Sequence, residues 1–335
     1  MARPRAPSGA EGPKEPHAVS LKVLRLSRPS MSYQNPLPTE DTRISPKASL
    51  CYPSDACDSQ FILSPNVTLP PAFGSAYVGE TFACSLCANN ELSEEETSRV
   101  VTSVRILAEM QTPSQVVSLD LVPAEMSGRV VSLGKGQSYQ KIVQFDLKEE
   151  GNHILAVSVS YTETVMAEDS QAASGRVRTF RKLYQFIAQP CLSVRTKASE
   201  LTPLEVDNKS LGPYGKTRLL RFALEAQLEN VGDGPVIVEQ TILNPKSPFK
   251  ARSLNWDLQT PHSPRLQRPT LNPRDVLQVA FLVEQEPGQQ DGLEALQKDL
   301  KRDGRATLGQ LSIEWRSAMG DRGFLNTGNL LTRKR

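Results

Sequence analysis

The chain has 335 residues, and its 39 lysines and arginines against 37 aspartates and glutamates leave a formal net charge of +2. Because single cores usually stop growing at roughly 250 residues, this length predicts two domains. Apolar residues make up 38% of the chain and charged residues 23%, so we expect folded domains rather than general disorder. The balanced charge lacks the basic footprint of a nucleic-acid-binding protein, and we expect no nucleic-acid partner.

Residues 1–17 are rich in proline, glycine and charge, which predicts a disordered N-terminal tail. No apolar stretch of secretory-signal length follows the basic residues of this segment. No window approaches the roughly 20 apolar residues of a membrane span. We therefore expect a cytoplasmic protein.

A first domain is expected from residue 18 to residue 189, because apolar and polar residues alternate through most of this range. The alternation is typical of strands that bury one face. It predicts strands over residues 77–86, 104–110, 117–121, 139–147 and 155–161. Two polar loops interrupt the pattern: a proline- and serine-rich segment from Ser30 to Pro71, and a second from Glu163 to Gly175.

A second domain is expected from residue 190 to residue 320, because Pro190 suits a linker or the start of an edge strand. Its clearest strands are predicted over residues 220–228, 277–283 and 311–315, and a proline-rich stretch covers residues 244–273. Helical spacing occurs only at Leu293, Leu296 and Leu300, in a short segment that Gly304 ends. Residues 321–335 are expected to form a basic C-terminal tail.

Strands at this spacing without crossover helices predict an all-β fold class. We expect tandem immunoglobulin-like β-sandwiches, with long Pro/Ser-rich loops and one short helix.

Cys84-Ser-Leu-Cys87 is the one motif that could carry chemistry, since a C-x-x-C pair can bind zinc or cycle between thiol and disulfide. A zinc site needs a second pair of ligands, and Cys51, Cys57 and Cys191 offer none at suitable spacing. In a strand, residues 84 and 87 also point to opposite faces. We interpret Cys84 as a buried core residue.

The three histidines do not form a catalytic pattern. His153 shares the parity of Leu155 and Val157, and we expect a backbone carbonyl as its partner rather than a reacting group. His17 and His262 lie in proline-rich segments, which hold a reacting group poorly. Phosphate-binding, nucleophile-elbow and zinc-helix motifs do not occur, so we expect no catalytic, cofactor or metal site and no enzyme.

Both tryptophans are candidate anchors. Trp315 lies on an alternating face and is expected in a core, whereas Trp256 in a loop region is a candidate interface residue. The basic end Leu330-Leu-Thr-Arg-Lys-Arg335 would supply only about 1 kcal/mol per charge at an acidic membrane surface, too little to anchor the chain alone.

Four segments resemble one family, the thirteenth subunit of the transport protein particle (TRAPP) complex. They are Leu21-Lys-Val-Leu-Arg-Leu-Ser-Arg-Pro29, Leu69-Pro-Pro-Ala-Phe-Gly-Ser-Ala-Tyr-Val-Gly-Glu-Thr-Phe82, the stretch from Gly151-Asn-His-Ile-Leu155 to Val159-Ser-Tyr161, and Trp315-Arg-Ser-Ala-Met-Gly-Asp-Arg-Gly323. The resemblance spans about 300 residues in order. Phe-Gly-Ser-Ala-Tyr-Val-Gly-Glu-Thr-Phe, residues 73–82, is its most diagnostic part.

The resemblance implies a non-catalytic accessory subunit of a vesicle-tethering complex that supports Rab GTPase activation in ER–Golgi trafficking and autophagy. It implies partners among the other TRAPP subunits, Rab GTPases indirectly, and peripheral association with Golgi membranes through the complex. Family members usually continue into a further β-sandwich, whereas this chain ends at Arg335. Two other hypotheses stay open: an arrestin-like cargo adaptor built from tandem β-sandwiches, and a thiol oxidoreductase or zinc protein that uses Cys84 and Cys87.

Overall fold

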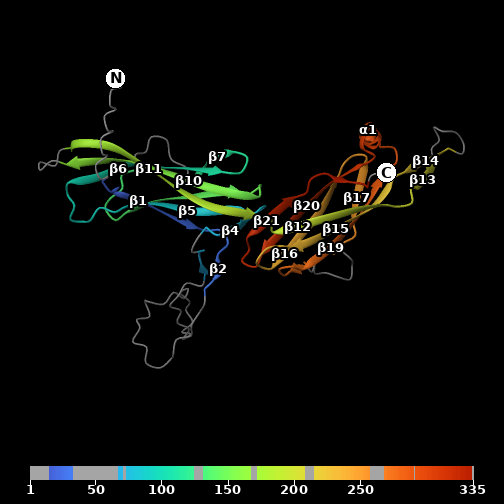
Figure 1. Ribbon diagram of the computed structural model, residues 1–335, viewed down its shortest axis with the longest axis horizontal. Coiled ribbons are helices and arrows are strands. Elements are labelled where there is room, and N and C mark those ends of the chain that lie inside the picture. Colours follow the sequence, from blue (N-terminus) through green and yellow to red (C-terminus); the bar gives the residue numbers. More distant parts are fainter. Residues whose placement is uncertain are drawn as a thin grey trace, which may run out of the picture. The chain divides into compact units, whose positions relative to one another are not determined.

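The computed structural model describes residues 15–32, 67–70, 73–123, 131–166, 172–207, 215–256, 268–289 and 291–333. Their contacts divide the chain into two compact units. The first unit gathers the described parts of residues 1–25, 83–144 and 154–185, and the second gathers those of residues 26–82, 145–153 and 186–335. Figure 1 shows the elements in chain order.

Two sheets contain most strands of the first half of the chain. One has the order β1-β5-β9-β8 and the other the order β4-β11-β10-β6-β7. The strands of the first sheet are β1 (Val19–Arg25), β5 (Thr81–Asn90), β8 (Leu121–Val122) and β9 (Ser138–Asp146). Those of the second are β4 (Ser75–Tyr77), β6 (Arg99–Gln111), β7 (Val116–Leu119), β10 (Gly151–Met166) and β11 (Ala172–Gln189). A short pair, β2 (Ser30–Met31) and β3 (Val67–Thr68), joins the two ends of the proline- and serine-rich segment.

Two further sheets contain the strands of the second half. One has the order β12-β15-β19-β17, and the other has the order β18-β16-β20-β21 with β22 also paired to β20. The strands of the first of these are β12 (Leu192–Glu200), β15 (Arg221–Asn230), β17 (Phe249–Ser253) and β19 (Val276–Gln285). Those of the second are β16 (Val236–Pro245), β18 (Thr270–Leu271), β20 (Thr307–Ser317), β21 (Arg322–Asn326) and β22 (Leu330–Leu331). A hairpin of β13 (Leu204–Asp207) and β14 (Lys216–Leu219) stands apart from both sheets.

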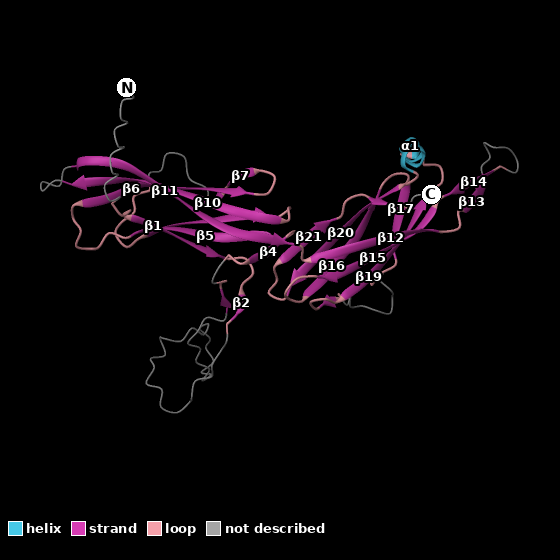
Figure 2. Ribbon diagram, in the orientation of Figure 1, coloured by secondary structure: helices cyan, strands magenta, loops and turns pink. Residues whose placement is uncertain are grey.

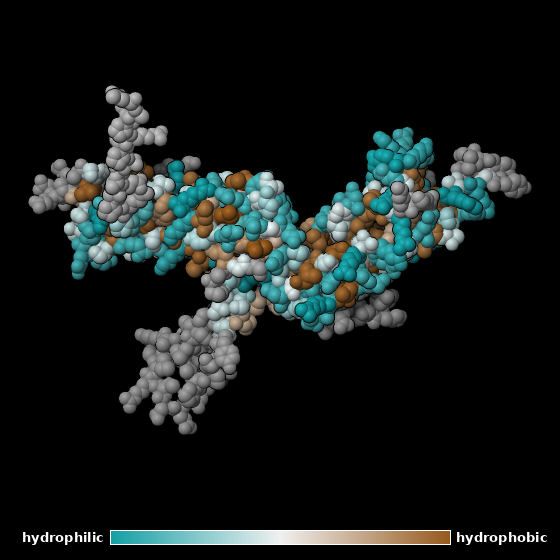
Figure 3. Space-filling model, viewed as in Figure 1, coloured by the Kyte–Doolittle hydropathy of each residue, from teal (hydrophilic) through white to brown (hydrophobic). Residues whose placement is uncertain are grey.

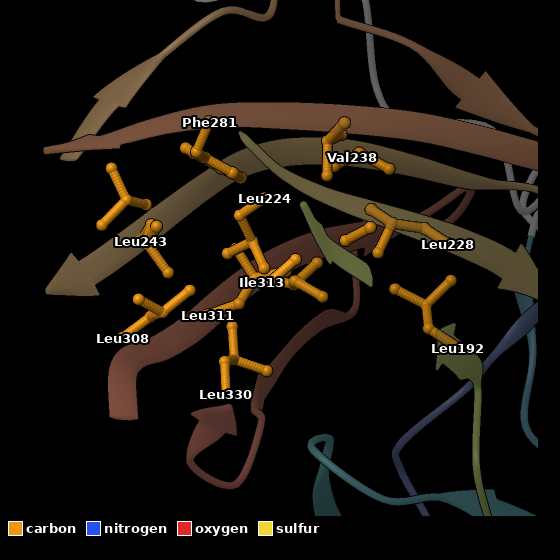
Figure 4. Packing of buried hydrophobic residues seen from close by; sticks show 14 of the residues in the cluster. Leu192, Leu224, Leu228, Val238, Leu243, Phe281, Leu308, Leu311, Ile313 and Leu330 are labelled. Carbon is orange, nitrogen blue, oxygen red and sulfur yellow. The ribbon is translucent and has the colours of Figure 1, made fainter. Parts of the chain in front are cut away.

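One apolar core lies between these last two sheets. Strand β15 buries Phe222, Leu224, Ala226 and Leu228, which alternate with more exposed residues as the period of two predicts. From the facing sheet, Leu311, Ile313 and Trp315 of β20 enter the same cluster. Figure 4 shows Leu224, Leu228, Leu311 and Ile313 within this packing. Apolar burial on both facing sheets is what makes this pair a sandwich.

The expected all-β fold class is confirmed, because strands dominate the described chain in Figure 2. The expected short helix is present as α1 (Leu293–Asp303). Its terminal Gly304 has φ 63°, and its backbone N–H donates to the carbonyl oxygen of Leu300. A glycine suits this left-handed C-cap because it lacks the Cβ that such a φ disfavours.

The expected C-terminal tail instead contains two strands. In residues 321–335, β21 pairs with β20 from Arg322 to Asn326, and β22 pairs with its opposite end. Buried Leu330 belongs to the apolar core. The segment is ordered because β20 is long enough to offer unpaired backbone groups at two places along one edge.

The expected polar loop from Glu163 to Gly175 is shorter in the structure. Strand β10 continues to Met166 and β11 begins at Ala172. The polarity of this stretch was misleading because Glu163, near the end of β10, is buried among arginines.

Candidate interaction surfaces

Cys84 and Cys87 lie on β5, which pairs with β1 so that Cys84 is opposite Arg25 and Cys87 is opposite Lys22. Cys84 is fully buried with Phe82 and Leu86, whereas Cys87 is partly exposed. Burial raises the pKa of the Cys84 thiol to about 12, so the thiol is neutral near pH 7. Because reactivity and metal binding need the thiolate, Cys84 is positioned for packing rather than for chemistry.

The other cysteines do not complete a site with this pair. Cys191 is buried, and burial raises its pKa to about 12 as well. Cys51 and Cys57 lie outside the described residues. Within the described ranges, no group of three or more His, Cys, Asp or Glu residues is close enough to hold a metal ion.

His153 is fully buried at the start of β10. Its Nδ1 lies 3.1 Å from the carbonyl oxygen of Gly151, and its ring stacks on Phe186 with 5.5 Å between the centroids. Since a carbonyl oxygen only accepts hydrogen bonds, Nδ1 carries the proton. The ring is therefore held as a packing element with a backbone partner, and His262 lies outside the described residues.

The two tryptophans contact the same core. Trp315 is buried within it, and Trp256 is partly buried and packs against its edge. Because Trp256 packs against the core, less of its ring surface is exposed to a partner than its predicted loop position suggests. No described helix is long and apolar enough to cross a membrane.

Glu163 is at the centre of a cluster of arginines in the first unit. Its side chain is only 2% exposed, and it pairs with Arg178 at 3.0 Å, Arg99 at 3.3 Å and Arg176 at 3.4 Å. Burial raises the pKa of this carboxyl, but the hydrogen bond and charge of Arg178, together with Arg176, outweigh burial and lower it overall. The cluster keeps one buried carboxylate ionised by surrounding it with cations.

Residues 15–17 lie against the same cluster. Arg178 donates to the carbonyl oxygens of Pro16 at 2.9 Å and Glu15 at 2.6 Å, and Arg176 pairs with the Glu15 carboxylate. The Nδ1 atom of His17 lies 3.0 Å from the hydroxyl of Tyr161. Burial and the nearby charge of Arg178 lower the pKa of His17. The Glu15 carboxylate and the backbone carbonyls of residues 15 and 16 are thus bound by arginine side chains of β11.

Arg28 is the centre of a second polar cluster, which lies in the second unit. Its guanidinium pairs with Asp233 at 2.8 Å, lies 4.0 Å from Glu80 and stacks 4.1 Å from the ring centroid of Tyr77. Its backbone N–H donates to Asp321 at 3.3 Å. The hydroxyl of Tyr77 accepts a hydrogen bond from the backbone N–H of Asp233 at 2.7 Å. Burial lowers the pKa of Arg28, but the carboxylates of Asp233 and Glu80 outweigh it and raise the pKa.

Two glycines permit close packing beside this cluster. Gly79 has φ 94° and accepts a hydrogen bond from Phe324 N–H at 2.9 Å. A Cβ on Gly79 would lie 2.7 Å from the Trp315 ring, and a Cβ on Gly323 would lie 2.2 Å from it. Glu80 and Gly323 also form an isolated antiparallel bridge. Only glycine leaves room for the indole ring between these two backbone segments.

Three of the four segments that carry the resemblance therefore meet around Arg28 and Trp315. Arg28 comes from residues 21–29, Tyr77 to Glu80 from residues 69–82, and Asp321 and Gly323 from residues 315–323. Because these segments are far apart in sequence and adjacent in space, their residues form one structural feature rather than separate motifs.

A groove of about 990 Å³ lies beside Trp315 in the second unit. Trp315 and Phe324 supply aromatic lining, and side chains of both charges border it. The carboxylate of Glu239 pairs with Arg316 at 2.9 Å and with Arg268 at 2.5 Å. Mutually paired charges of this kind do not single out one class of ligand.

Comparison with known protein families shows which family the chain belongs to. Two family models match the chain: "Trafficking protein particle complex subunit 13, N-terminal" over residues 17–188, and the middle domain of the same subunit over residues 192–334. The chain belongs to the TRAPP subunit 13 family. The resemblance noted in the sequence is thereby confirmed.

Members of the TRAPP subunit 13 family from several animals align with almost the whole chain. The protein named trafficking protein particle complex subunit 13 in Xenopus laevis is 27% identical over 330 residues, which are 95% of this chain and 69% of the relative. The probable homolog in Drosophila melanogaster is 27% identical over 94% of this chain and 64% of the relative. A solved secreted serine protease, VesC from Vibrio cholerae, aligns with a TM-score of 0.23 at 9% identity over 66% of this chain and 46% of its own, too low to carry an argument.

Sequence reasoning missed both arginine clusters in this TRAPP subunit 13 family member. A signal was present for Glu163, since it has the same parity as Val159 and Tyr161 on β10. For Arg28 the only signal was its place inside a resembling segment. Neither signal names the partners, because these come from strands distant in sequence.

Proposed function

We propose that this protein is a non-catalytic accessory subunit of a TRAPP-type vesicle-tethering complex, where it supports Rab GTPase activation in ER–Golgi trafficking and autophagy. The family match over both halves of the chain is the observation that carries the proposal. Its partners would be the other subunits of the complex, with Rab GTPases reached indirectly. Its place would be the cytoplasm and, through the complex, the periphery of Golgi membranes.

The side chains that could carry chemistry support a non-catalytic role. Cys84 has its pKa raised by burial to about 12, and His153 is buried against a backbone carbonyl. A general base or nucleophile has to reach a substrate in a suitable protonation state. Sheets with exposed faces and edges instead supply surfaces for docking.

The division into two sandwich domains is part of this proposal. We place the boundary between the domains at residues 189–190, with residues 1–17 as an N-terminal tail and with β21 and β22 in the second domain. Limited proteolysis with mass spectrometry tests the division, since a linker at residues 189–190 would be cut before the sheets on either side.

The experiment that tests the proposed function is purification of the tagged full chain from its own cells, with identification of the proteins recovered. Recovery of TRAPP subunits in amounts near one per chain is expected. A variant with Arg28→Glu should recover less of them if the cluster of resembling segments supports the docking surface. The matched control is Arg195→Glu, since Arg195 pairs with Glu229 on an exposed strand face.

The alternatives predict different outcomes. An arrestin-like cargo adaptor would elute from gel filtration partly as a small species, whereas a subunit should elute mainly in a large complex. A thiol oxidoreductase would lose function when Cys84 and Cys87 are both replaced by Ala. Absence of every TRAPP subunit from the purified material would overturn the proposed function.

A further inference from the structure

Residues 15–17, which we call the N-terminal latch, lie against strands β10 and β11 in the first unit. Arg178 of β11 donates to the carbonyl oxygens of Glu15 at 2.6 Å and Pro16 at 2.9 Å, and Arg176 pairs with the Glu15 carboxylate. Within the described chain, no backbone–backbone hydrogen bond joins these three residues to a strand. Contacts that involve side chains therefore hold the latch in place.

A segment of the second unit that also covers an aromatic ring is held more firmly. Gly79 packs against the ring of Trp315 and accepts a hydrogen bond from the backbone N–H of Phe324 at 2.9 Å. His17 packs against Phe180 of β11, with 4.8 Å between the ring centroids, and has no such backbone bond. Segments with few backbone hydrogen bonds open at a low cost in free energy, so the latch is the more easily released of the two.

The hydroxyl of Tyr161 favours one protonation state of the latch. It accepts a hydrogen bond from the backbone N–H of Ala18 at 3.1 Å, and it lies 3.0 Å from Nδ1 of His17. Tyr161 is only 1% exposed, so its own O–H needs an acceptor within the protein, and Nδ1 is within reach. Nδ1 can accept this hydrogen bond only when it carries no proton. The hydrogen bonds of the hydroxyl are therefore complete only while Nδ1 of His17 is unprotonated.

Charges on two strands act on His17 in opposite directions. Burial and then the Arg178 guanidinium of β11 lower the pKa of His17, whereas the Glu163 carboxylate of β10 raises it by less. A proton on His17 would therefore place a second cation beside the guanidinium that holds the latch. The other charged groups of this cluster are paired with one another: Arg99 of β6 and Arg176 of β11 with Glu163, and Glu15 with Arg176.

We infer that the N-terminal latch is released by acid: it stays docked on β10 and β11 while Nδ1 of His17 is unprotonated, and it leaves them when His17 takes up a proton. Protonation removes the acceptor of the Tyr161 O–H and adds a cation beside Arg178. His17 is exposed, so a proton reaches its ring without prior opening of the structure. The inference does not depend on the proposed function, because it concerns contacts within one chain.

Release of the latch changes the surface of the first unit. It uncovers the hydroxyl of Tyr161 and the ring of Phe180, and it frees the N–H groups of Arg178 that bind the two carbonyl oxygens. Figure 3 shows hydrophobic residues at the surface over the region of β7 and β10, among hydrophilic ones. The released state therefore adds aromatic surface to a face that already exposes apolar side chains.

The pH range of release follows from the charges around His17. A free histidine titrates near pH 6.5, and the pKa of docked His17 is lower. Docking is therefore strongest above about pH 7 and weakens as pH falls below 6.5. Because one proton is taken up, the docking equilibrium constant falls by at most about 10-fold per pH unit. The pKa of Glu163 is lowered from 4.5, so this carboxylate keeps its charge through the same range.

The direct test compares the full chain with its His17→Asn variant, whose side-chain oxygen can accept from Tyr161 but does not titrate. Hydrogen exchange of the Ala18 N–H, read by mass spectrometry at several pH values, measures docking. The ratio of the two proteins removes the intrinsic effect of pH on exchange. Protection of wild type relative to the variant is expected to fall several-fold, and at most about 10-fold, between pH 7.5 and pH 5.5.

A second variant tests the role of the hydroxyl. Tyr161→Phe removes it and keeps the ring, so protection of Ala18 should fall about fivefold at every pH. NMR of histidine-labelled protein follows the titration of His17, since the chain has only three histidines. The pKa of His17 should move toward 6.5 in Tyr161→Phe, whereas a purely structural role of the ring would leave it unchanged. Thermal melts show that both variants fold.

Four results would overturn the inference. They are a pKa of His17 at or above 6.5 in the wild-type chain, the same pH dependence of protection in wild type and His17→Asn, and an unchanged pKa of His17 in Tyr161→Phe. The fourth is a loss of protection at pH 5.5 that extends through β1, because it would show unfolding of the domain rather than release of the latch.

Discussion

Strands β15 and β10 both bury every second residue, but the faces that they bury differ in chemistry. Strand β15 buries Phe222, Leu224, Ala226 and Leu228 in an apolar core. Strand β10 buries Leu155, Val157 and Val159 and then continues with Tyr161 and Glu163 on the same face. The period of two is therefore a reliable guide to which residues face inward, and a poor guide to whether the inner face is apolar.

The two buried faces differ because Glu163 lies near the end of its sheet. In the middle of a sandwich a charge has no polar partner, so only apolar residues are tolerated there. Near the end of β10, arginines from β6 and β11 reach Glu163. A carboxylate with three such partners is stable in a place where an isolated one would not be.

The largest expected effect on stability comes from giving β15 a buried carboxylate, as β10 has in Glu163, without the arginines that pair with Glu163. Leu224→Asp puts a carboxylate opposite Phe281, among the apolar side chains of the core. We expect a loss of more than about 4 kcal/mol in the free energy of unfolding, enough to unfold the second sandwich. Circular dichroism and thermal melts measure it.

The matched control is Glu225→Gln at the next residue of β15. Glu225 lies outside the core and pairs with Lys197 at 3.6 Å on an exposed face. Such a pair contributes less than about 1 kcal/mol. Equal effects of the two substitutions would show that the facing of β15 is wrong.

The second-largest loss of stability is expected from Glu163→Gln. The amide leaves Arg99, Arg176 and Arg178 without their buried anion, at a cost of about 3 kcal/mol. Chemical denaturation of both proteins measures the difference. Glu109→Gln is the control, because Glu109 pairs with Arg181 on the exposed face of the same sheet and should cost less than about 1 kcal/mol.

The pH dependence of this difference has a definite sign. The pKa of Glu163 is lowered in the folded protein from its ordinary value of 4.5. A carboxyl with a lowered folded-state pKa stabilises the protein above pH 4.5, and this stabilisation is lost as pH falls through the folded-state pKa. The gap between wild type and Glu163→Gln should therefore be full near pH 7 and shrink below pH 4.5; a gap that widened in acid would contradict the ion-pair account.

An intermediate effect is expected where backbone packs against Trp315. Gly323→Ala would place a Cβ within 2.2 Å of the ring, and the resulting overpacking should cost about 2 kcal/mol. Gly328→Ala is the control, since nothing lies within 4 Å of its added Cβ. Tryptophan fluorescence and urea denaturation report on both, and an unaffected Gly323→Ala protein would show that the ring has room to move.

The smallest expected effect is the difference in stability between serine variants of the two cysteines of β5. Cys84→Ser buries a hydroxyl in place of a thiol whose pKa burial has raised to about 12, and we expect a loss of about 1–2 kcal/mol. Cys87→Ser, at a partly exposed position, should change stability by less than about 0.5 kcal/mol. Alkylation at pH 8 followed by peptide mass spectrometry should label Cys87 before Cys84; the opposite order would mean that Cys84 is not a core residue.

The sequence by itself determined the all-β fold class, the inward-facing residues of β15 and the short helix ended by Gly304. These follow from local rules, because side-chain direction alternates along a strand and glycine alone easily adopts a left-handed cap. The family was also readable from the sequence, since its segments are contiguous stretches of chain.

The tertiary structure decided which of those segments meet and where polar residues are buried. Arg28 finds Asp233, and Glu163 finds Arg176 and Arg178, through strand order rather than through local sequence. Pairing between distant strands is set by the whole fold, and no local pattern of residues encodes it.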